Sequence, residues 1–227
     1  MSTAIVTGAA SGIGAACVAA IRARGVRVGA IDLAPAADAD ASAVADVLDH
    51  AALAAAVAQL EAELGPCDHL VTCAGRYWER PLADLSPDDW SGMLRLHVGG
   101  TAAAIRCVLP GMLERGRGTV VAVGSELGLI GDPNAPHYAA AKGAIHALVK
   151  SLGVETAARG VRVNAIAPGP TDTPLLRDDP EFPNYGATLP LGRVIRPDEI
   201  AAAVCFALLE DTTLNAQVVS PNAGAVL

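Results

Sequence analysis

A tyrosine and a lysine stand four residues apart in the second half of the chain, and a serine precedes the tyrosine by 13 residues. Tyr138 and Lys142, in the sequence YAAAK, would share one face of a helix, one turn apart. Free tyrosine has a pKa of about 10, and a neighbouring cation lowers that pKa by favouring the phenolate. Ser125 could hydrogen-bond the same substrate oxygen. Proton exchange with an alcohol or carbonyl oxygen is one reading of this spacing, and a packed tyrosine beside a solvated lysine is the other.

A second group, near the N-terminus, has the composition of a phosphate-binding loop. The sequence TGAASGIG, residues 7–14, follows an apolar run and precedes a helical stretch. Its small residues let the backbone turn sharply and approach a pyrophosphate at the positive end of the next helix. Taken alone, the glycines also fit a tight turn without a ligand. A strand before the loop, a helix after it, and an acid 18 residues past Gly14 favour a dinucleotide site.

That acid is Asp32, at the end of the second apolar run. A carboxylate in this place accepts hydrogen bonds from ribose hydroxyls and repels a 2′-phosphate, although a lone strand-end carboxylate can also be merely solvated. The loop carries Ser11 rather than a basic residue, and Leu33 and Ala34 bring no cation. The sequence therefore predicts NAD in preference to NADP.

These distant residues need a scaffold that brings them to one edge. Short, continuous apolar runs alternate with helical stretches from end to end, which predicts a parallel sheet buried on both faces. No composition break divides the chain, so we expect one α/β domain over residues 1–227. The expected strands are 3–7, 26–33, 44–47, 69–73, 119–123, 161–167 and 217–220, and the expected helices are 13–24, 50–64, 90–115, 135–158 and 197–209.

The overall composition excludes several classes of protein. The 227 residues are 52% hydrophobic and carry 16 Lys+Arg against 24 Asp+Glu, a net charge of −8. The chain is too apolar for a disordered protein, and its acidity argues against nucleic-acid and anionic-membrane surfaces. Five cysteines in apolar settings, without metal-ligand spacing, are expected to be buried free thiols. With no leader peptide or membrane span expected, the predicted location is the cytoplasm.

At this point the chain resembles the short-chain dehydrogenases/reductases over essentially its whole length. The resemblance implies a Rossmann-type three-layer fold, a homotetramer or homodimer, and hydride transfer between a nicotinamide and a small alcohol or ketone. It is carried by the loop TGAASGIG, Asp32, Asp46-Val47, Ala74-Gly75, Ser125, the YAAAK sequence and Pro168-Gly169.

The resemblance also implies roles for single residues. Tyr138 would be the general acid/base and Ser125 would polarise the carbonyl. Lys142 would lower the Tyr138 pKa and bind the nicotinamide ribose. The implied cofactor-binding residues are Gly8, Ser11, Gly12, Ile13, Gly14, Asp32, Asp46, Val47, Ala74, Gly75, Tyr138, Lys142, Pro168, Gly169, Thr171 and Thr173.

Two departures from the family pattern affect these expectations. Thr72-Cys73 stands where the family has two asparagines, so an amide that braces the sheet is missing. His97 stands where the family has a catalytic asparagine that supports a chain of waters from the lysine. Histidine can hydrogen-bond a water and titrates near neutral pH. We hypothesise that His97 replaces that asparagine as a proton-relay element; the alternative is a tolerated substitution with weak activity.

The substrate would lie at the carboxyl ends of the strands, where the loops 76–80, 126–136 and 171–196 are expected to meet. The long, proline-rich segment 171–196 is interpreted as a substrate lid. Aromatic side chains in these loops suggest an apolar or ring-bearing substrate, or simply anchor the loops. Arg76, Arg80, Arg177 and Arg193 could recognise an anionic group or be solvated. The candidate substrate residues are Tyr77, Trp78, Glu126, Phe182 and Tyr185.

Three functions remain open from the sequence. The leading prediction is an NAD-dependent oxidoreductase of secondary alcohols and ketones with Tyr138 as general acid/base. His97 and Cys73 leave open a catalytically weak NAD-binding sensor or scaffold. A 3-ketoacyl-carrier-protein reductase is the third, although it would be expected to want NADPH and a basic docking patch, both poorly indicated in this acidic chain.

Overall fold

The computed structural model describes residues 1–178 and 182–225. Seven parallel strands form one sheet in the order β3-β2-β1-β4-β5-β6-β7. The strand order reverses between β1 and β4, which is where an open α/β sheet binds ligands. The strands are β1 (Thr3–Thr7), β2 (Arg27–Asp32), β3 (Ala41–Val44), β4 (His69–Thr72), β5 (Gly118–Val123), β6 (Val161–Ile166) and β7 (Val218–Val219).

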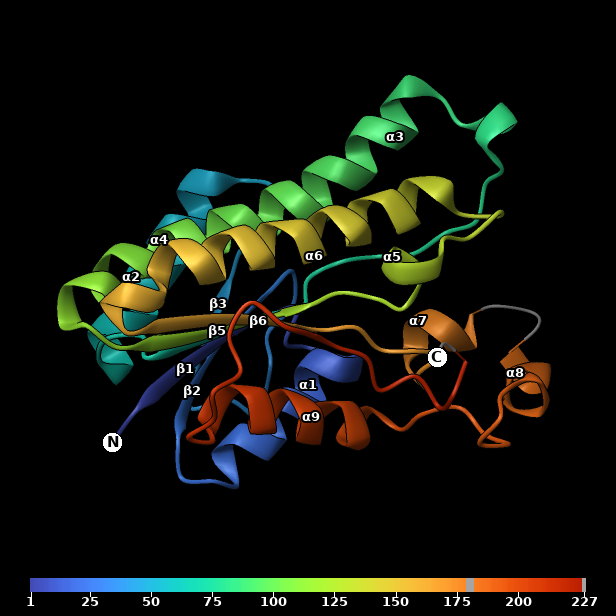
Figure 1. The fold of residues 1–227 in the computed structure, drawn as a ribbon. Coiled ribbons are helices and arrows are strands. Elements are labelled where there is room, and N and C mark those ends of the chain that lie inside the picture. Colours follow the sequence, from blue (N-terminus) through green and yellow to red (C-terminus); the bar gives the residue numbers. More distant parts are fainter. Residues whose placement is uncertain (179–181, 226–227) are drawn as a thin grey trace.

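Helices cover both faces of this sheet (Figure 1). Helices α2, α4 and α6 lie over one face, and α1 and α9 lie over the other. The buried side chains accordingly form two clusters, one on each side of the sheet, built mainly from Ala, Val, Leu and Ile. The long helices are α1 (Gly12–Arg22), α2 (His50–Leu64), α3 (Pro87–Leu94), α4 (Gly100–Arg115), α6 (Pro136–Thr156) and α9 (Pro197–Leu209); the short ones are α5 (Leu127–Ile130), α7 (Pro174–Arg177) and α8 (Phe182–Thr188).

Helices α3 and α4 are one continuous rod joined by a π-helical turn, Arg95–Gly99. His97 lies inside this turn, and such turns are frequent at functional sites. By length and composition alone, the run Pro87–Arg115 could cross a membrane. In the fold, however, α4 packs against α2 and β5, so its apolar side chains belong to the core.

Several expected elements need correction. The third strand is β3, Ala41–Val44, and not 44–47, so Asp46 and Val47 lie in the loop that follows it. The segment 171–196 is less irregular than expected, because it contains α7 and α8; residues 179–181 lie outside the described part. All five cysteines are free, but Cys73 and Cys107 are only half-buried.

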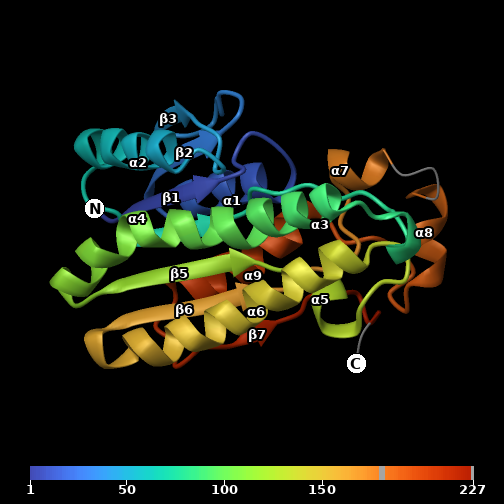
Figure 2. The same ribbon diagram turned by 90° about the horizontal axis from the view of Figure 1, so that it is seen from above.

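The carboxyl ends of the strands carry the loops that matter for function. Figure 2 shows α5, α7 and α8 gathered beyond this end of the sheet. The loops after β1, β4, β5 and β6 all open there, as the parallel arrangement requires. Residues from the first and last thirds of the sequence thus reach one edge.

Candidate active site

The loop after β1 is built for a close approach of backbone to backbone. Gly8 has φ +68°, and a Cβ on it would lie 2.6 Å from the backbone nitrogen of Ala74. A Cβ on Gly14 would overlap the carbonyl oxygen of Gly8. Ser11 precedes α1 in an extended conformation, and its hydroxyl caps no backbone amide of that helix. The first amides of α1 and the Ser11 hydroxyl therefore face the end of the sheet, as an anion site needs.

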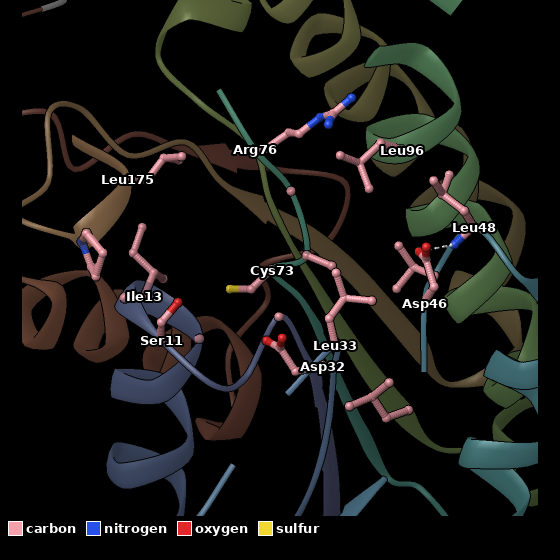
Figure 3. A pocket seen from close by; sticks show the side chains of 18 of the residues that line it. Ser11, Ile13, Asp32, Leu33, Asp46, Leu48, Cys73, Arg76, Leu96 and Leu175 are labelled. Carbon is pink, nitrogen blue, oxygen red and sulfur yellow. Dashed lines mark hydrogen bonds between the residues drawn. The ribbon is translucent and has the colours of Figure 1, made fainter. Parts of the chain in front are cut away.

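A cavity of about 630 Å³ opens beside this loop, within the size range of cofactor sites. The Asp32 carboxylate lies at it and accepts hydrogen bonds from the backbone of Ala10 (2.9 Å) and Ala34 (3.3 Å). Figure 3 shows Asp32 near Ser11, with Asp46 and Leu48 farther along the wall. The predicted cofactor residues that line this cavity are Gly8, Ser11, Gly12, Ile13, Gly14, Asp32, Asp46, Val47, Ala74, Gly75 and Thr173.

The cavity suits a dinucleotide for a reason beyond its size. The glycines leave no side chain between the loop and the opposite wall, the α1 N-terminus faces it, and a carboxylate stands where ribose hydroxyls need an acceptor. It also holds residues that sequence reasoning missed. The sequence around Asp32 suggested that no cation lies near the cofactor. In the structure, however, Arg76 and Arg95 line the same cavity. The other unpredicted lining residues are Ile31, Leu33, Ala45, Leu48, Cys73, Gly92, Leu96, Pro174, Leu175 and Asp178.

Ser125, Tyr138 and Lys142 come together as their spacing predicted. Tyr138 and Lys142 lie one turn apart on α6, and the ammonium nitrogen of Lys142 is 5.5 Å from the centre of the Tyr138 ring. Ser125 follows β5, and its hydroxyl lies near enough to the Tyr138 hydroxyl to lower the pKa of that group. The Lys142 ammonium donates a hydrogen bond to the carbonyl oxygen of Val123, 2.9 Å away, at the end of β5.

Burial shifts both titratable groups of this trio. It raises the pKa of Tyr138 to about 12, against the opposing effect of the Ser125 hydroxyl. It lowers the pKa of Lys142 to about 8. Lys142 is not among the groups that shift the pKa of Tyr138 here; burial of the phenol is the main cause. The role of Lys142 in lowering that pKa stays a prediction. At neutral pH, Tyr138 is a protonated phenol that can donate to a carbonyl oxygen.

His97 does not titrate near neutral pH. Its ring is buried, and burial together with the Lys142 charge lowers its pKa to about 3. The ring packs edge-on against Tyr138, with centroids 5.3 Å apart, and Nε2 lies 2.9 Å from the Arg76 carbonyl oxygen. Nε2–H therefore donates, which leaves Nδ1 as an acceptor without a partner among the described residues. A neutral His97 could still hydrogen-bond a water through Nδ1. The proton relay through His97 therefore stays a prediction only for a neutral imidazole that holds a water.

A second cavity, of about 400 Å³, lies against Ser125 and Tyr138. Ile13, Thr173 and Leu175 line both cavities, so the two adjoin. The predicted residues in its wall are Tyr77, Ser125, Glu126, Tyr138, Pro168, Gly169, Thr171, Thr173 and Tyr185. Trp78 and Phe182 are not among its lining residues; Trp78 instead packs on the His137 ring, 4.9 Å between centroids. Glu79, Asp132 and Leu176 line it without having been predicted.

Glu126 is buried rather than facing solvent as a loop residue would. The residue is only 6% exposed, and its Oε2 atom has no hydrogen-bond partner among the described residues. Its backbone N–H donates to the carbonyl of Pro168 (2.9 Å), which fixes its place between β5 and the loop after β6. Burial raises the pKa of Glu126 to about 7.

This burial predicts a pH-dependent cost in stability. Between pH 4.5 and about 7 the folded chain holds a proton on Glu126 that the unfolded chain has lost, so stability falls as pH rises through that range. Glu126→Gln removes the ionisation. We expect the variant to gain up to about 3 kcal/mol in free energy of unfolding relative to wild type above the folded pKa, and little of this gain below pH 4.5. Thermal unfolding of both proteins at about pH 8 and about pH 5 measures the two differences; equal differences would contradict the prediction.

The four arginines of the surrounding loops are already engaged. Arg80 pairs with Asp89 (2.6 Å), Arg177 with Asp172 (2.6 Å), and Arg193 with Glu199 (2.7 Å). Arg76 stacks over the Trp78 ring, 4.4 Å from its centre, and lines the dinucleotide cavity rather than the one beside Tyr138. Recognition of an anionic substrate by these side chains is therefore not favoured by the structure.

Comparison with known proteins shows the family to which the chain belongs. The family model described as "Enoyl-(Acyl carrier protein) reductase" matches residues 8–225. Cis-4-hydroxycyclohexanecarboxylate dehydrogenase of Sinomonas cyclohexanicum is 38% identical over 89% of this chain and 87% of its own length. 2-Dehydro-3-deoxy-L-rhamnonate dehydrogenase (NAD(+)) of a Sphingomonas strain is 38% identical over 92% of this chain and 88% of its own. The crystal structure of gox2181 has a TM-score of 0.92 and 33% identity, with 98% of this chain and 95% of that chain covered.

The doubly wound parallel sheet, its glycine loop and the trio beside it define an oxidoreductase of the Rossmann type. The chain belongs to the short-chain dehydrogenase/reductase family.

Proposed function

We propose that the protein is an NAD-dependent dehydrogenase that interconverts a secondary alcohol and a ketone, with Tyr138 as general acid/base. One observation carries this proposal: Ser125 and Tyr138 line the same cavity, which adjoins the cavity beside the glycine loop. A substrate oxygen at their hydroxyls would place its carbon beside the shared wall formed by Ile13, Thr173 and Leu175.

A bound nicotinamide would supply the hydride acceptor for oxidation and the hydride donor for reduction. The glycine loop and Asp32 would hold the rest of the cofactor. In reduction, the protonated Tyr138 phenol gives its proton to the substrate oxygen while Ser125 donates a hydrogen bond to the same atom. In oxidation, the phenolate takes that proton back. Because burial raises the pKa of Tyr138 to about 12, oxidation should accelerate as pH rises.

The experiment that tests this function follows NAD⁺ and NADP⁺ reduction with a mixed panel of secondary alcohols, and NADH oxidation with the matching ketones. NAD-linked turnover supports the proposal. Tight NADH binding without turnover of any member contradicts it and favours the sensor or scaffold function. The same purified protein, analysed by sedimentation, tests the further proposal of a homodimer or homotetramer.

The preference for NAD makes a separate prediction. Asp32→Asn keeps an acceptor for the Ala10 amide but loses the charge that repels a 2′-phosphate and strengthens hydrogen bonds from ribose hydroxyls. We expect the ratio of kcat/KM with NAD⁺ to kcat/KM with NADP⁺ to fall by about 10- to 100-fold. Initial rates over a range of both cofactors give this ratio. Asp84→Asn, at an exposed position that does not line this cavity, is the matched control; an equal fall in both variants would argue against a special role for Asp32.

A further inference from the structure

The cavity beside Ser125 and Tyr138 is lined by acids. Glu79, Glu126 and Asp132 all contribute to its wall, and none of its described lining residues is a lysine or an arginine. The nearby arginines Arg80, Arg177 and Arg193 are committed to carboxylates elsewhere on the surface. A substrate that carries a carboxylate or phosphate would meet uncompensated repulsion in this cavity.

Glu126 is the acid closest to the chemistry in the chain, directly after Ser125. Its Oε2 atom is buried and has no donor among the residues that the structure describes. A buried acceptor without a donor costs free energy. Because Oε2 is itself closed off, a ligand in the cavity would reach the carboxyl group of Glu126 through its other oxygen. Oε2 lies close against Gly169: a Cβ on that glycine would be 3.0 Å from Oε2 and 2.8 Å from the Cα of Asn222. The carboxyl group is thus held at the cavity wall with one acceptor position unused.

A second set of acceptors comes from Glu79, in the loop after β4, and Asp132, in the loop after α5. The Tyr77 hydroxyl is 2.9 Å from Oε1 of Glu79 and 3.1 Å from Oδ2 of Asp132. A phenol has one proton, so it can donate to only one of these carboxylates at a time. The Tyr77 ring also packs edge-on against Tyr138, with centroids 5.0 Å apart. The reacting position therefore lies between two groups of oxygen acceptors that both call for hydrogen-bond donors.

We propose that the substrate is an uncharged polyol, in which a hydroxyl next to the reacting carbinol donates a hydrogen bond to Glu126 and a more distant hydroxyl reaches the carboxylates beside Tyr77. This inference rests on the proposed function. It replaces the expectation of an apolar or ring-bearing substrate drawn from the loop aromatics.

An ammonium group would also supply donors, but two observations favour hydroxyls. Asn134 also lines the cavity, and its amide can both donate to and accept from a hydroxyl, whereas an ammonium group only donates. Burial also raises the pKa of Glu126 to about 7, so this carboxyl group carries only part of a negative charge at neutral pH. A site built to pair a hydroxyl rejects an analogue that lacks it, because its own polar atoms are then left unpaired.

The test compares four-carbon substrates that each contain at least one secondary carbinol. These are threitol, 2,3-butanediol, 2-butanol, 3-hydroxybutanoate and 3-amino-2-butanol, supplied as all stereoisomers. We expect kcat/KM to be at least about tenfold higher for threitol than for 2-butanol, and lowest for 3-hydroxybutanoate. Glu126→Leu should reduce the threitol to 2-butanol ratio by about tenfold or more, and Glu126→Gln, which keeps one acceptor, by less. Glu155→Gln, an exposed glutamate on α6, is the matched control and should keep the wild-type ratio.

The outcomes distinguish a failure of the polyol inference from a failure of the proposed function. A threitol to 2-butanol ratio near one in wild type, or an unchanged ratio in Glu126→Leu, overturns the polyol inference and leaves the proposed function intact. Faster turnover of 3-amino-2-butanol than of threitol overturns it in favour of a cationic substrate. No turnover of any panel member or matching ketone, by a protein that binds NADH and unfolds cooperatively, contradicts the proposed function itself.

Discussion

Replacing Tyr138 with phenylalanine is expected to lower kcat for alcohol oxidation by about a hundred- to ten-thousand-fold. The substitution removes one hydroxyl from a ring that is held on α6 by Tyr77 and His97, which both pack edge-on against it. Neither ring contact uses the hydroxyl, so the fold should tolerate phenylalanine. What is lost is the proton donor and acceptor at the substrate oxygen. The change in kcat is measured from the steady-state rate of NADH formation, with an alcohol that the wild-type enzyme oxidises.

Binding of the cofactor provides the control for this variant. NADH affinity, measured by fluorescence titration, should stay within about threefold of wild type, because a lost hydroxyl contact costs little when no buried partner is stranded. The Ser125 hydroxyl accepts a hydrogen bond from the Leu127 amide at 3.2 Å, so it keeps a partner when the Tyr138 hydroxyl is removed. Retention of more than a tenth of wild-type kcat in Tyr138→Phe would mean that another group performs the proton transfer.

Replacing Gly14 with alanine is expected to abolish cofactor binding at concentrations that saturate wild type. The new methyl group would overlap the Gly8 carbonyl oxygen and lie 2.7 Å from the Gly8 carbonyl carbon. Gly8 has no room to move away from this methyl group, because it packs closely against the backbone of Ala74 and Cys73. The loop must therefore change shape, and a displacement of about 1 Å at a binding loop can cost a hundredfold in function. We expect NADH affinity to fall by about a hundredfold or more.

Gly99→Ala is the matched control for this change. Gly99 has helical dihedral angles, φ −61° and ψ −49°, and nothing lies within 4 Å of the Cβ that it would gain. That variant should bind NADH as wild type does and should unfold at the same or a slightly higher temperature, since alanine favours a helix over glycine. Equal NADH affinity of Gly14→Ala and Gly99→Ala would show that the loop is not the cofactor cradle.

The sequence predicted the scaffold best where local signals were strong. Helix α2 runs from His50 to Leu64 as expected, because Asp49 caps its first amides and Gly65-Pro66 ends it. The third strand was misplaced because the apolar residues at 44–47 suggested pairing, whereas the ladder with β2 is formed by Ala41–Val44. The residue pattern does not predict the π-helical turn, because its hydrogen bonds depend on how α3 and α4 pack against the rest of the protein.

The site was predictable by residue type but not by environment. Spacing alone brought Ser125, Tyr138 and Lys142 together, and the glycine loop with Asp32 gave the dinucleotide cavity. The pKa values of Tyr138, His97 and Glu126 could not be foreseen, because each is shifted mainly by burial. Burial depends on which loops close over a side chain, and that is decided by contacts between residues far apart in the chain. Glu126 is the clearest example, because it lies in a loop and is nevertheless buried.

The π-helical turn accommodates one residue more than a regular α-helix would need. Five residues bonded in the π-helical pattern turn the chain about as far as four residues in the α-helical pattern. Ala103, Ala104 and Val108 of α4 therefore still pack in the core after the turn. The extra residue lies where His97 is buried beside Tyr138. Deleting one residue from Arg95–Gly99 should therefore preserve most of the packing of α4 and displace the backbone mainly at His97.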